Sequence, residues 1–230
     1  MRTYFLNFIK PMTFVFIVSA LLFTSCNNDD DAIASPTPDA TETLNTVIAV
    51  PFFVQNENQE MPSNPDDLLY EVRKNNPVIA PDGHQVTWGE FASVQGNIEV
   101  ECMDNQTKVS LLVNGLIPYG QYTIWNVTFD APGIDPSHPM LGLEGLGAAG
   151  KGDGSDNSFV ADAMGEGSIT LTSPGGPLSM IGSIGNCALL DNYEWHVVGT
   201  YHIDGRTYGG DLGPDGTVAE HFGFIFKNND

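Results

Sequence analysis

Two stretches near the end of the sequence decide the fold: YEWHVVGTYH (193–202) and TVAEHFGFIF (217–226). Alternate side chains of a β-strand point to opposite faces of the sheet. In the first stretch this alternation gives an aromatic face made of Tyr193, Trp195, Val197 and Tyr201. The other face carries Glu194, His196, Val198, Thr200 and His202. The second stretch adds Phe222, Phe224 and Phe226, so we expect an antiparallel pair that packs its aromatic face on a core.

Further strands are expected upstream, separated by turn residues. The candidates are HQVTWGEF (84–91), NIEVECM (97–103), KVSLLVNGL (108–116), QYTIWNVTF (121–129) and a hairpin of 158–163 with 166–172 around Met164-Gly165. The chain contains 25 Gly and 15 Pro, which favours many tight turns, and only DLLYEVRKNN (67–76) could form a short helix. The sequence therefore predicts an all-β fold, an antiparallel two-sheet β-sandwich, with a closed β-barrel as the alternative.

Strand parity also predicts which side chains enter the core. In QYTIWNVTF we expect Trp125, Val127 and Phe129 to face inward, and the half-polar opposite face with Tyr122 and Asn126 to meet solvent. In NIEVECM, Cys102 shares the inward face with Ile98 and Val100. Cys102 and Cys187 could then form a disulfide in an oxidising compartment, worth about 4 to 5 kcal/mol; two separate buried thiols are the alternative.

The N-terminus carries an export signal. Arg2 and Lys10 flank an apolar run that ends in LFTSC (22–26), and small residues precede Cys26. This segment resembles a bacterial lipobox, which implies that residues 1–25 are removed as a signal peptide and that Cys26 is acylated. The following residues NNDDD (27–31) resemble the acidic tag of surface lipoproteins of the Bacteroidota. The resemblance implies an outer-membrane protein that is anchored by lipid and faces the exterior.

Composition limits the partners. Residues 26–45 are rich in Asp, Ser, Thr and Pro and predict a disordered tether, which leaves residues 46–230 for a single β-sandwich domain. The formal net charge is −21, with 29 acidic and 8 basic residues. Such a chain repels nucleic acid and anionic lipid headgroups. We therefore expect no nucleic-acid partner and contact with the membrane through the lipid anchor alone.

A longer resemblance covers residues 88–226. It includes WGEFASVQGNIEVEC, VNGLIPYGQYTIWNVTFDAPG, GLGAAGKGDGSDNSF and GSIGNCALLDNYEWHVVGTYHIDGRTYG. These stretches are similar to a group of exported bacterial proteins that are themselves uncharacterised. The resemblance implies export and an all-β fold, and it implies no activity, ligand or catalytic residue.

Three places could hold a metal ion. If 193–202 and 217–226 pair in regular register, His196 and His221 lie on the same face about 7 Å apart, with Glu194 one pleat along. Two imidazoles and a carboxylate suit zinc or copper, although a bulge at Gly199 could alter the arrangement and the sequence lacks the usual copper motifs. Asp153, Asp156 and Asn157 offer oxygen ligands for calcium, as do Asp204, Asp211 and Asp215, although their spacing also fits ordinary turns.

Enzymatic motifs are otherwise missing. The sequence has no GxSxG, and its many carboxylates single out no catalytic pair. Four aromatic residues could stack on sugar rings or could instead cover the core: Trp88, Tyr119, Tyr122 and Tyr208. We therefore expect a non-catalytic binding or structural module, with glycan or another envelope polymer as ligand. The alternative is a metal-dependent enzyme that uses the set of Glu194, His196 and His221.

Overall fold

The structure, a computed structural model, describes residues 47–49, 53–103, 106–130, 133–135, 138, 141–174 and 193–226. These residues fall within one compact unit, residues 40–230. They form one short helix, α1 (Trp88–Phe91), and the following strands: β1 (Val47–Ala49), β2 (Val54–Gln55), β3 (Tyr70–Glu71), β4 (Gln95–Met103), β5 (Gln106–Asn114), β6 (Gln121–Asp130), β7 (Leu143–Ala148), β8 (Ser158–Val160), β9 (Gly167–Pro174), β10 (Tyr193–His202) and β11 (Val218–Phe226). No helix within the described ranges is both long and apolar enough to cross a membrane.

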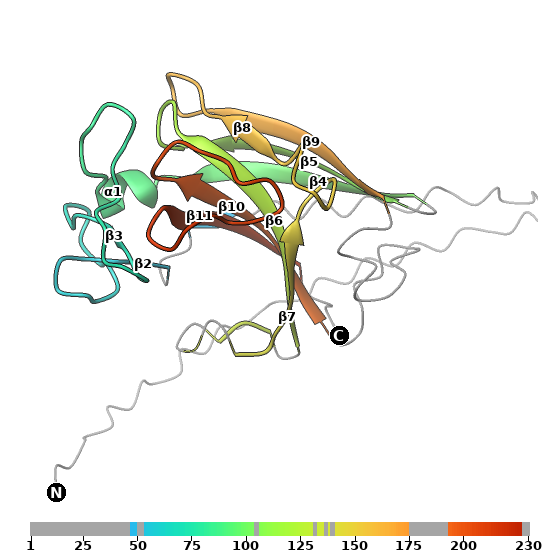
Figure 1. The fold of residues 1–230 in the computed structure, drawn as a ribbon, viewed down its shortest axis with the longest axis horizontal. Coiled ribbons are helices and arrows are strands. Elements are labelled where there is room, and N and C mark those ends of the chain that lie inside the picture. Colours follow the sequence, from blue (N-terminus) through green and yellow to red (C-terminus); the bar gives the residue numbers. More distant parts are fainter. Residues whose placement is uncertain are drawn as a thin grey trace, which may run out of the picture. The chain divides into compact units, whose positions relative to one another are not determined.

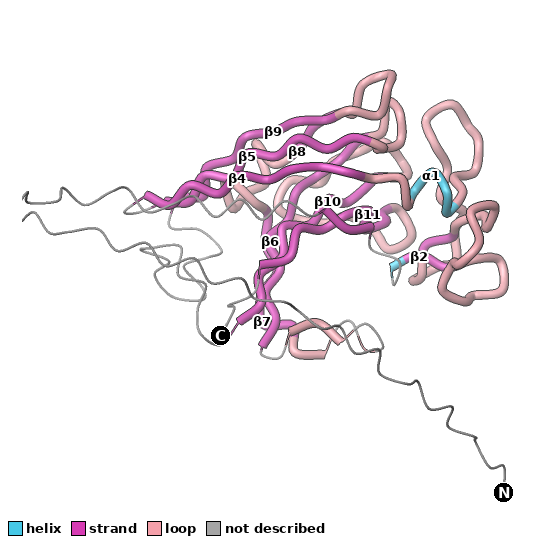
Figure 2. The backbone as a smooth tube through the Cα atoms, turned by 180° about the vertical axis from the view of Figure 1, so that it is seen from behind, coloured by secondary structure: helices cyan, strands magenta, loops and turns pink. Residues whose placement is uncertain are grey.

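The strands form two main antiparallel sheets (Figures 1 and 2). The larger sheet has the order β1-β11-β10-β6-β7, with β8 paired to the other end of the β6 edge, and the smaller has the order β4-β5-β9. Strands β2 and β3 make a separate two-stranded ladder. Neither main sheet closes on itself. The predicted all-β sandwich is confirmed, and the barrel alternative is wrong.

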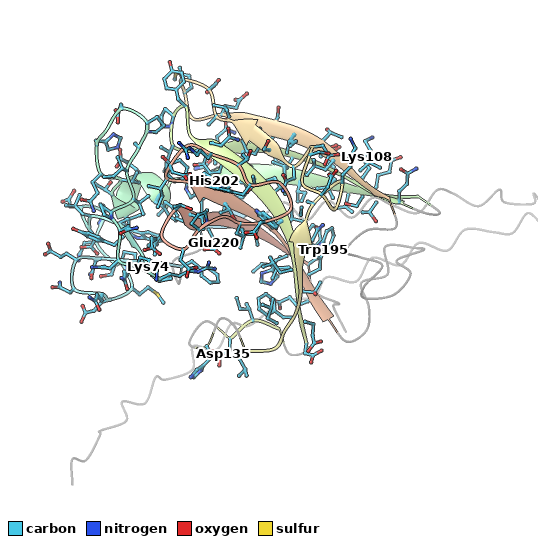
Figure 3. All side chains as sticks on the ribbon, in the orientation of Figure 1. Lys74, Lys108, Asp135, Trp195, His202 and Glu220 are labelled. Atoms are coloured by element: carbon cyan, nitrogen blue, oxygen red, sulfur yellow. The ribbon has the colours of Figure 1, made fainter. Side chains whose placement is uncertain are left out.

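The core lies between the facing sides of the two sheets. From the smaller sheet, β5 contributes Val109, Leu111 and Val113, whereas its intervening residues are exposed or half-buried. From the larger sheet the core receives Tyr122, Ile124, Trp195, Val197, Tyr201, Phe222, Phe224 and Phe226. The predicted aromatic face of the last strand pair is thus confirmed except at Tyr193, whose side chain lies outside the described part of the chain. In Figure 3, Lys108 marks the smaller sheet, and Trp195 and His202 mark β10.

The outer face of the larger sheet is buried as well, and this changes the expected role of β6. Tyr122 and Ile124 face the core, and Asn126, on the same side, accepts a hydrogen bond from the Trp195 indole N–H at 3.1 Å. Trp125 and Phe129, which the sequence placed in the core, lie on the outer face and are also buried. The predicted inside and outside of this strand are therefore reversed, because β6 is a central strand whose two faces are both covered.

Two loops contribute to this cover. A Cβ built on Gly154 would lie 2.1 Å from the carbonyl oxygen of Gly209, so the loops after β7 and after β10 touch through their backbones. Gly154 also has a φ of +67°, a conformation that other residues seldom adopt. The second loop places Tyr208 with its ring centroid 6.3 Å from that of His202.

A β-bulge interrupts the pairing of β10 with β11. Gly199 lies opposite Phe222, but the next residue, Thr200, lies opposite Glu220. His221 is therefore an extra residue on β11. The alternation of side chains between the two faces of the sheet is broken at this residue. Gly199 also admits the Phe222 ring, since a Cβ there would lie 2.1 Å from Cζ.

Two local predictions are wrong. The segment 67–76 holds β3 and turns instead of a helix, and the helix is α1, within a segment expected to be a strand. Thr87 and Glu90 form a capping box at its start, with the Thr87 amide donating to the Glu90 carboxylate at 2.8 Å. The expected hairpin around Met164-Gly165 is a connection between sheets, because β8 pairs with β6 and β9 pairs with β5.

Candidate functional site

The predicted polar face of β10 exists, but it is buried. Glu194, His196, Thr200 and His202 are all nearly inaccessible. Glu194 Oε1 lies 2.5 Å from His196 Nε2 and accepts a hydrogen bond from the Ile134 amide at 3.2 Å. The His196 ring also packs against Phe129, with ring centroids 5.0 Å apart. The expected proximity of Glu194 and His196 is confirmed.

His221 does not join this pair. The bulge turns it to the core side of the sheet, where its ring stacks on Phe91 with centroids 4.0 Å apart. Its Nε2 lies 2.8 Å from the Phe91 carbonyl oxygen, and its Nδ1 lies 2.9 Å from the Tyr122 hydroxyl. The prediction that His196 and His221 share a face is therefore wrong, and the set of Glu194, His196 and His221 is not brought together.

The hydrogen bonds fix the state of the His221 ring. A carbonyl oxygen only accepts, so Nε2 must carry a proton and donate it to Phe91. The Tyr122 hydroxyl accepts from the Ile117 amide at 3.0 Å and is free to donate to Nδ1. Burial lowers the pKa of His221 to about 4. The imidazole is thus neutral at neutral pH and connects three elements of the core.

A second buried histidine lies on the outer face. The Thr123 hydroxyl oxygen accepts from the Trp125 indole N–H at 2.7 Å and lies 2.8 Å from His202 Nε2. Burial lowers the pKa of His202 to about 4, against the smaller opposite influence of Asp204. His202 Nδ1 and the Thr200 hydroxyl have no hydrogen-bond partner in the part of the chain that the structure describes. Because its pKa is about 4, His202 is neutral at neutral pH.

Two of the three calcium candidates in residues 153–157 are engaged in their own loop, and the third is bonded to β6. Asp153 Oδ1 accepts from the Ser155 amide at 3.0 Å, a bond that lowers the pKa of Asp153. Asp156 Oδ1 accepts from the Lys151 amide at 2.8 Å, and Asn157 Nδ2 donates to the Ile124 carbonyl at 3.1 Å. The two aspartate bonds are those of turn residues, whereas the buried Asn157 ties the loop to β6. Among the described residues, no three His, Cys, Asp or Glu side chains are placed to hold a metal ion.

The two predicted cysteine roles depend on residues or side chains outside the described part of the chain. Cys26 and Cys187 are not described, and for Cys102 only the backbone position opposite Thr107 is described. Acylation of Cys26 and the disulfide between Cys102 and Cys187 therefore remain predictions. The tether, residues 26–45, lies outside as well.

The four aromatic candidates differ in their exposure to solvent. Tyr122 is fully buried, Trp88 and Tyr208 are half-buried, and Tyr119 is 63% exposed. The Tyr208 hydroxyl is also hydrogen-bonded, at 2.5 Å, to Asp204. Tyr119 is the most exposed of the four.

Tyr119 occupies a strained turn. The Gly120 amide donates to the Ile117 carbonyl at 2.9 Å, which closes a four-residue turn with Pro118 and Tyr119 at its centre. Tyr119 has a φ of +59°, at the position of a type II turn that glycine normally fills. A bulky side chain there costs about 1 to 2 kcal/mol.

Neighbouring segments hold this turn in place. The turn joins β5 to β6, and the segment 161–166 joins β8 to β9, so the chain passes between the sheets twice at this end. Three backbone hydrogen bonds tie the two connections together: Leu116 to Gly165 at 3.0 Å, Tyr119 to Asp162 at 3.3 Å and Ala161 to Gly120 at 3.0 Å. These bonds therefore hold the backbone of Tyr119 in its strained conformation.

Two more apolar side chains are exposed on or next to these connecting segments. Val160, at the end of β8, is 57% exposed, and Met164, in the turn after it, is 85% exposed. We call Tyr119, Val160 and Met164 the Tyr119 platform. The only charged residues in the two connecting segments, 115–120 and 161–166, are Asp162 and Glu166, both exposed.

Sequence reasoning included Tyr119 among four candidates but could not separate it from them. The available signal was the Ile117-Pro118-Tyr119-Gly120 turn, in which Pro is followed by a residue at the glycine-favouring position. Comparisons with known proteins offer no guidance: no family model matches the chain, and no curated protein is significantly similar to it.

Proposed function

We propose that this protein is a surface-exposed lipoprotein of the outer membrane whose β-sandwich binds glycan through the Tyr119 platform. The observation that carries the proposal is the exposure of Tyr119 in a backbone conformation that disfavours it. Strain of this kind persists where the surrounding structure maintains it, and it is concentrated at functional sites. A solvent-facing tyrosine ring offers an apolar face for stacking on a sugar ring.

Glycan suits the platform better than a protein partner does. A stable protein interface buries about 800 Å² on each side and usually has a broad apolar centre with Arg among its residues. The platform has three exposed apolar side chains and no basic residue in its connecting segments. Carboxylates beside an aromatic ring can accept hydrogen bonds from sugar hydroxyls.

The location supports a ligand of the cell envelope. Cys26 after a short apolar run, followed by NNDDD, is the sequence evidence for lipid anchoring at the outer surface. A net charge of −21 opposes binding of the protein body to anionic lipid headgroups. A polymer that extends into the surroundings could still reach a platform held away from the membrane.

The test is a glycan-binding measurement on the purified protein and on Tyr119→Gly. Removal of the ring should weaken binding about tenfold, the equivalent of roughly 1.4 kcal/mol. Because glycine accepts the φ of +59° without strain, Tyr119→Gly should be no less stable to urea than the parent protein. Loss of binding could then not be attributed to unfolding.

Leu112→Ala provides the matched control, because Leu112 is an exposed apolar side chain on the outer face of β5. It should leave glycan binding unchanged. Unaltered binding by Tyr119→Gly would contradict the platform. A parent protein that binds no member of a broad glycan panel would contradict the function and favour a structural role.

A further inference from the structure

We infer that the Tyr119 platform selects uncharged glycans and rejects those that carry carboxylate or sulfate groups. This inference rests on the proposed glycan-binding function and adds the class of ligand. It follows from the charges of Asp162 and Glu166 on the connecting segment beside the platform, from the hydrogen bonds that hold Asp162, and from the charge of the chain as a whole.

Asp162 is held in a fixed orientation. Its Oδ1 accepts hydrogen bonds from the Met164 amide at 2.8 Å and from the Glu166 amide at 2.9 Å. Its backbone carbonyl accepts from the Tyr119 amide. The carboxyl group is therefore fixed on a residue whose backbone is bonded to that of Tyr119, and among the described residues only its Oδ1 oxygen is hydrogen-bonded. The other oxygen, Oδ2, can accept a hydrogen bond from a sugar hydroxyl.

Glu166 adds a second exposed carboxylate on the same connecting segment. Residues 115–125 and 158–171, which contain both connecting segments and the adjoining parts of β6, β8 and β9, include no Lys, Arg or His. An anionic sugar that stacks on Tyr119 would therefore meet two negative charges and no cation from these segments. A neutral sugar would meet two hydrogen-bond acceptors.

The effect is moderate and depends on salt. Two carboxylates about 8 Å from an anionic group, acting through water, reduce affinity roughly fivefold. Screening removes most of such a repulsion at high ionic strength. The net charge of −21 acts in the same direction at low salt. Selection against anionic glycans should hence be strongest in dilute buffer.

The experiment uses the purified full chain and two matched pairs of polymers, at low and at high salt. One pair is fully methyl-esterified homogalacturonan and its de-esterified form, and the other is dextran and dextran sulfate. At low salt we expect binding to the neutral member of a pair to be at least about fivefold tighter. The double variant Asp162→Asn with Glu166→Gln should reduce this preference to about twofold or less, and an asparagine oxygen can still accept the two amide bonds at position 162.

The control variant Glu99→Gln with Glu101→Gln removes the same two charges from the exposed side of β4. It should retain the preference. If it loses the preference as fully as the platform variant does, the selection belongs to net charge alone and the inference is overturned. Equal or tighter binding of the anionic polymers to the parent protein at low salt also overturns it, while glycan binding stands. If the parent protein binds neither these polymers nor any other glycan, the proposed function itself is contradicted.

Discussion

His221 shows that residue type alone does not predict a site, because a histidine that could bind a metal ion is placed in the core instead. An imidazole beside a carboxylate on a strand pair indicates a metal site, and His196 with Glu194 fits that description in part. His221 instead fills both ring nitrogens with core partners, the Phe91 carbonyl and the Tyr122 hydroxyl. The hydrogen bonds of the His221 ring therefore stabilise the fold.

Protonation of His221 should therefore destabilise the fold in acid. Its pKa is about 4 in the folded protein and about 6.5 in the unfolded chain. Between these values the unfolded chain binds a proton that the folded protein does not, so stability is complete above pH 6.5 and falls as the pH drops towards 4. The full loss is about 3 kcal/mol, and His202 acts in the same direction.

Urea unfolding at several pH values checks this prediction. His221→Gln should reduce the slope of unfolding free energy against pH between 4 and 6.5. His84→Gln is the comparison. The pKa of this exposed histidine is raised, mainly by its hydrogen bond to Asp82 and also by the charge of Glu90. The contribution of His84 to stability is therefore lost only above pH 6.5, outside the tested range. An equally steep slope in His221→Gln would show that other groups control the acid sensitivity.

At the scale of elements, the β10–β11 bulge determines which side chains share a face. Gly199 makes room for Phe222, and the ring would lie 2.1 Å from a Cβ at that position. Phe222 is fully buried among other core aromatics and cannot move aside freely. The close approach and the register shift occur at the same place.

Gly199→Ala should consequently destabilise the protein by about 1 to 3 kcal/mol, the usual cost of overpacking a core. Chemical denaturation with circular dichroism is the measurement. Gly152→Ala is the matched control, because a Cβ on Gly152 meets nothing within 4 Å. The control should change stability by less than about 0.5 kcal/mol. Equal effects of the two substitutions would mean that the Phe222 contact is not tight.

The elements that the sequence predicts best are those with long alternation. Strands β4, β5, β6, β10 and β11 lie within two or three residues of the predicted stretches. Alternation does not reveal which strand becomes central, so the two faces of β6 were interchanged. It also cannot show a bulge, because His221 differs from its neighbours only in the register that the partner strand imposes. Helix α1 had a local signal, the Thr87-to-Glu90 capping box.

The candidate site was less predictable for the same reason. Tyr119 and Met164 are distant in sequence, and they lie on two connections between sheets that are tied together by backbone bonds. No residue pattern in the sequence predicts that the two connections are joined. Of the proposed site, only the aromatic residue and its turn could be found from the sequence.

At the scale of the whole molecule, the proposed location depends on Cys26. Cys26→Ser should abolish acylation and leave the precursor uncleaved, because a lipoprotein signal peptidase requires the cysteine. Mass spectrometry of the membrane fraction checks the modification, and protease treatment of intact cells checks exposure at the surface. Protection of the normal protein from protease would contradict the outward orientation and leave lipid anchoring intact.

The short strand β1 has a mechanical consequence. It is the first described strand of the chain and pairs with β11 through only Val47, Ile48 and Ala49, whereas β10 and β11 share a much longer ladder. Tension applied at the N-terminus must pass through β1 before it reaches the rest of the larger sheet. A pull from that end would detach the three residues of β1 first and leave the β10–β11 ladder intact. Strand β1 would therefore unfold before the rest of the domain, which carries Tyr119.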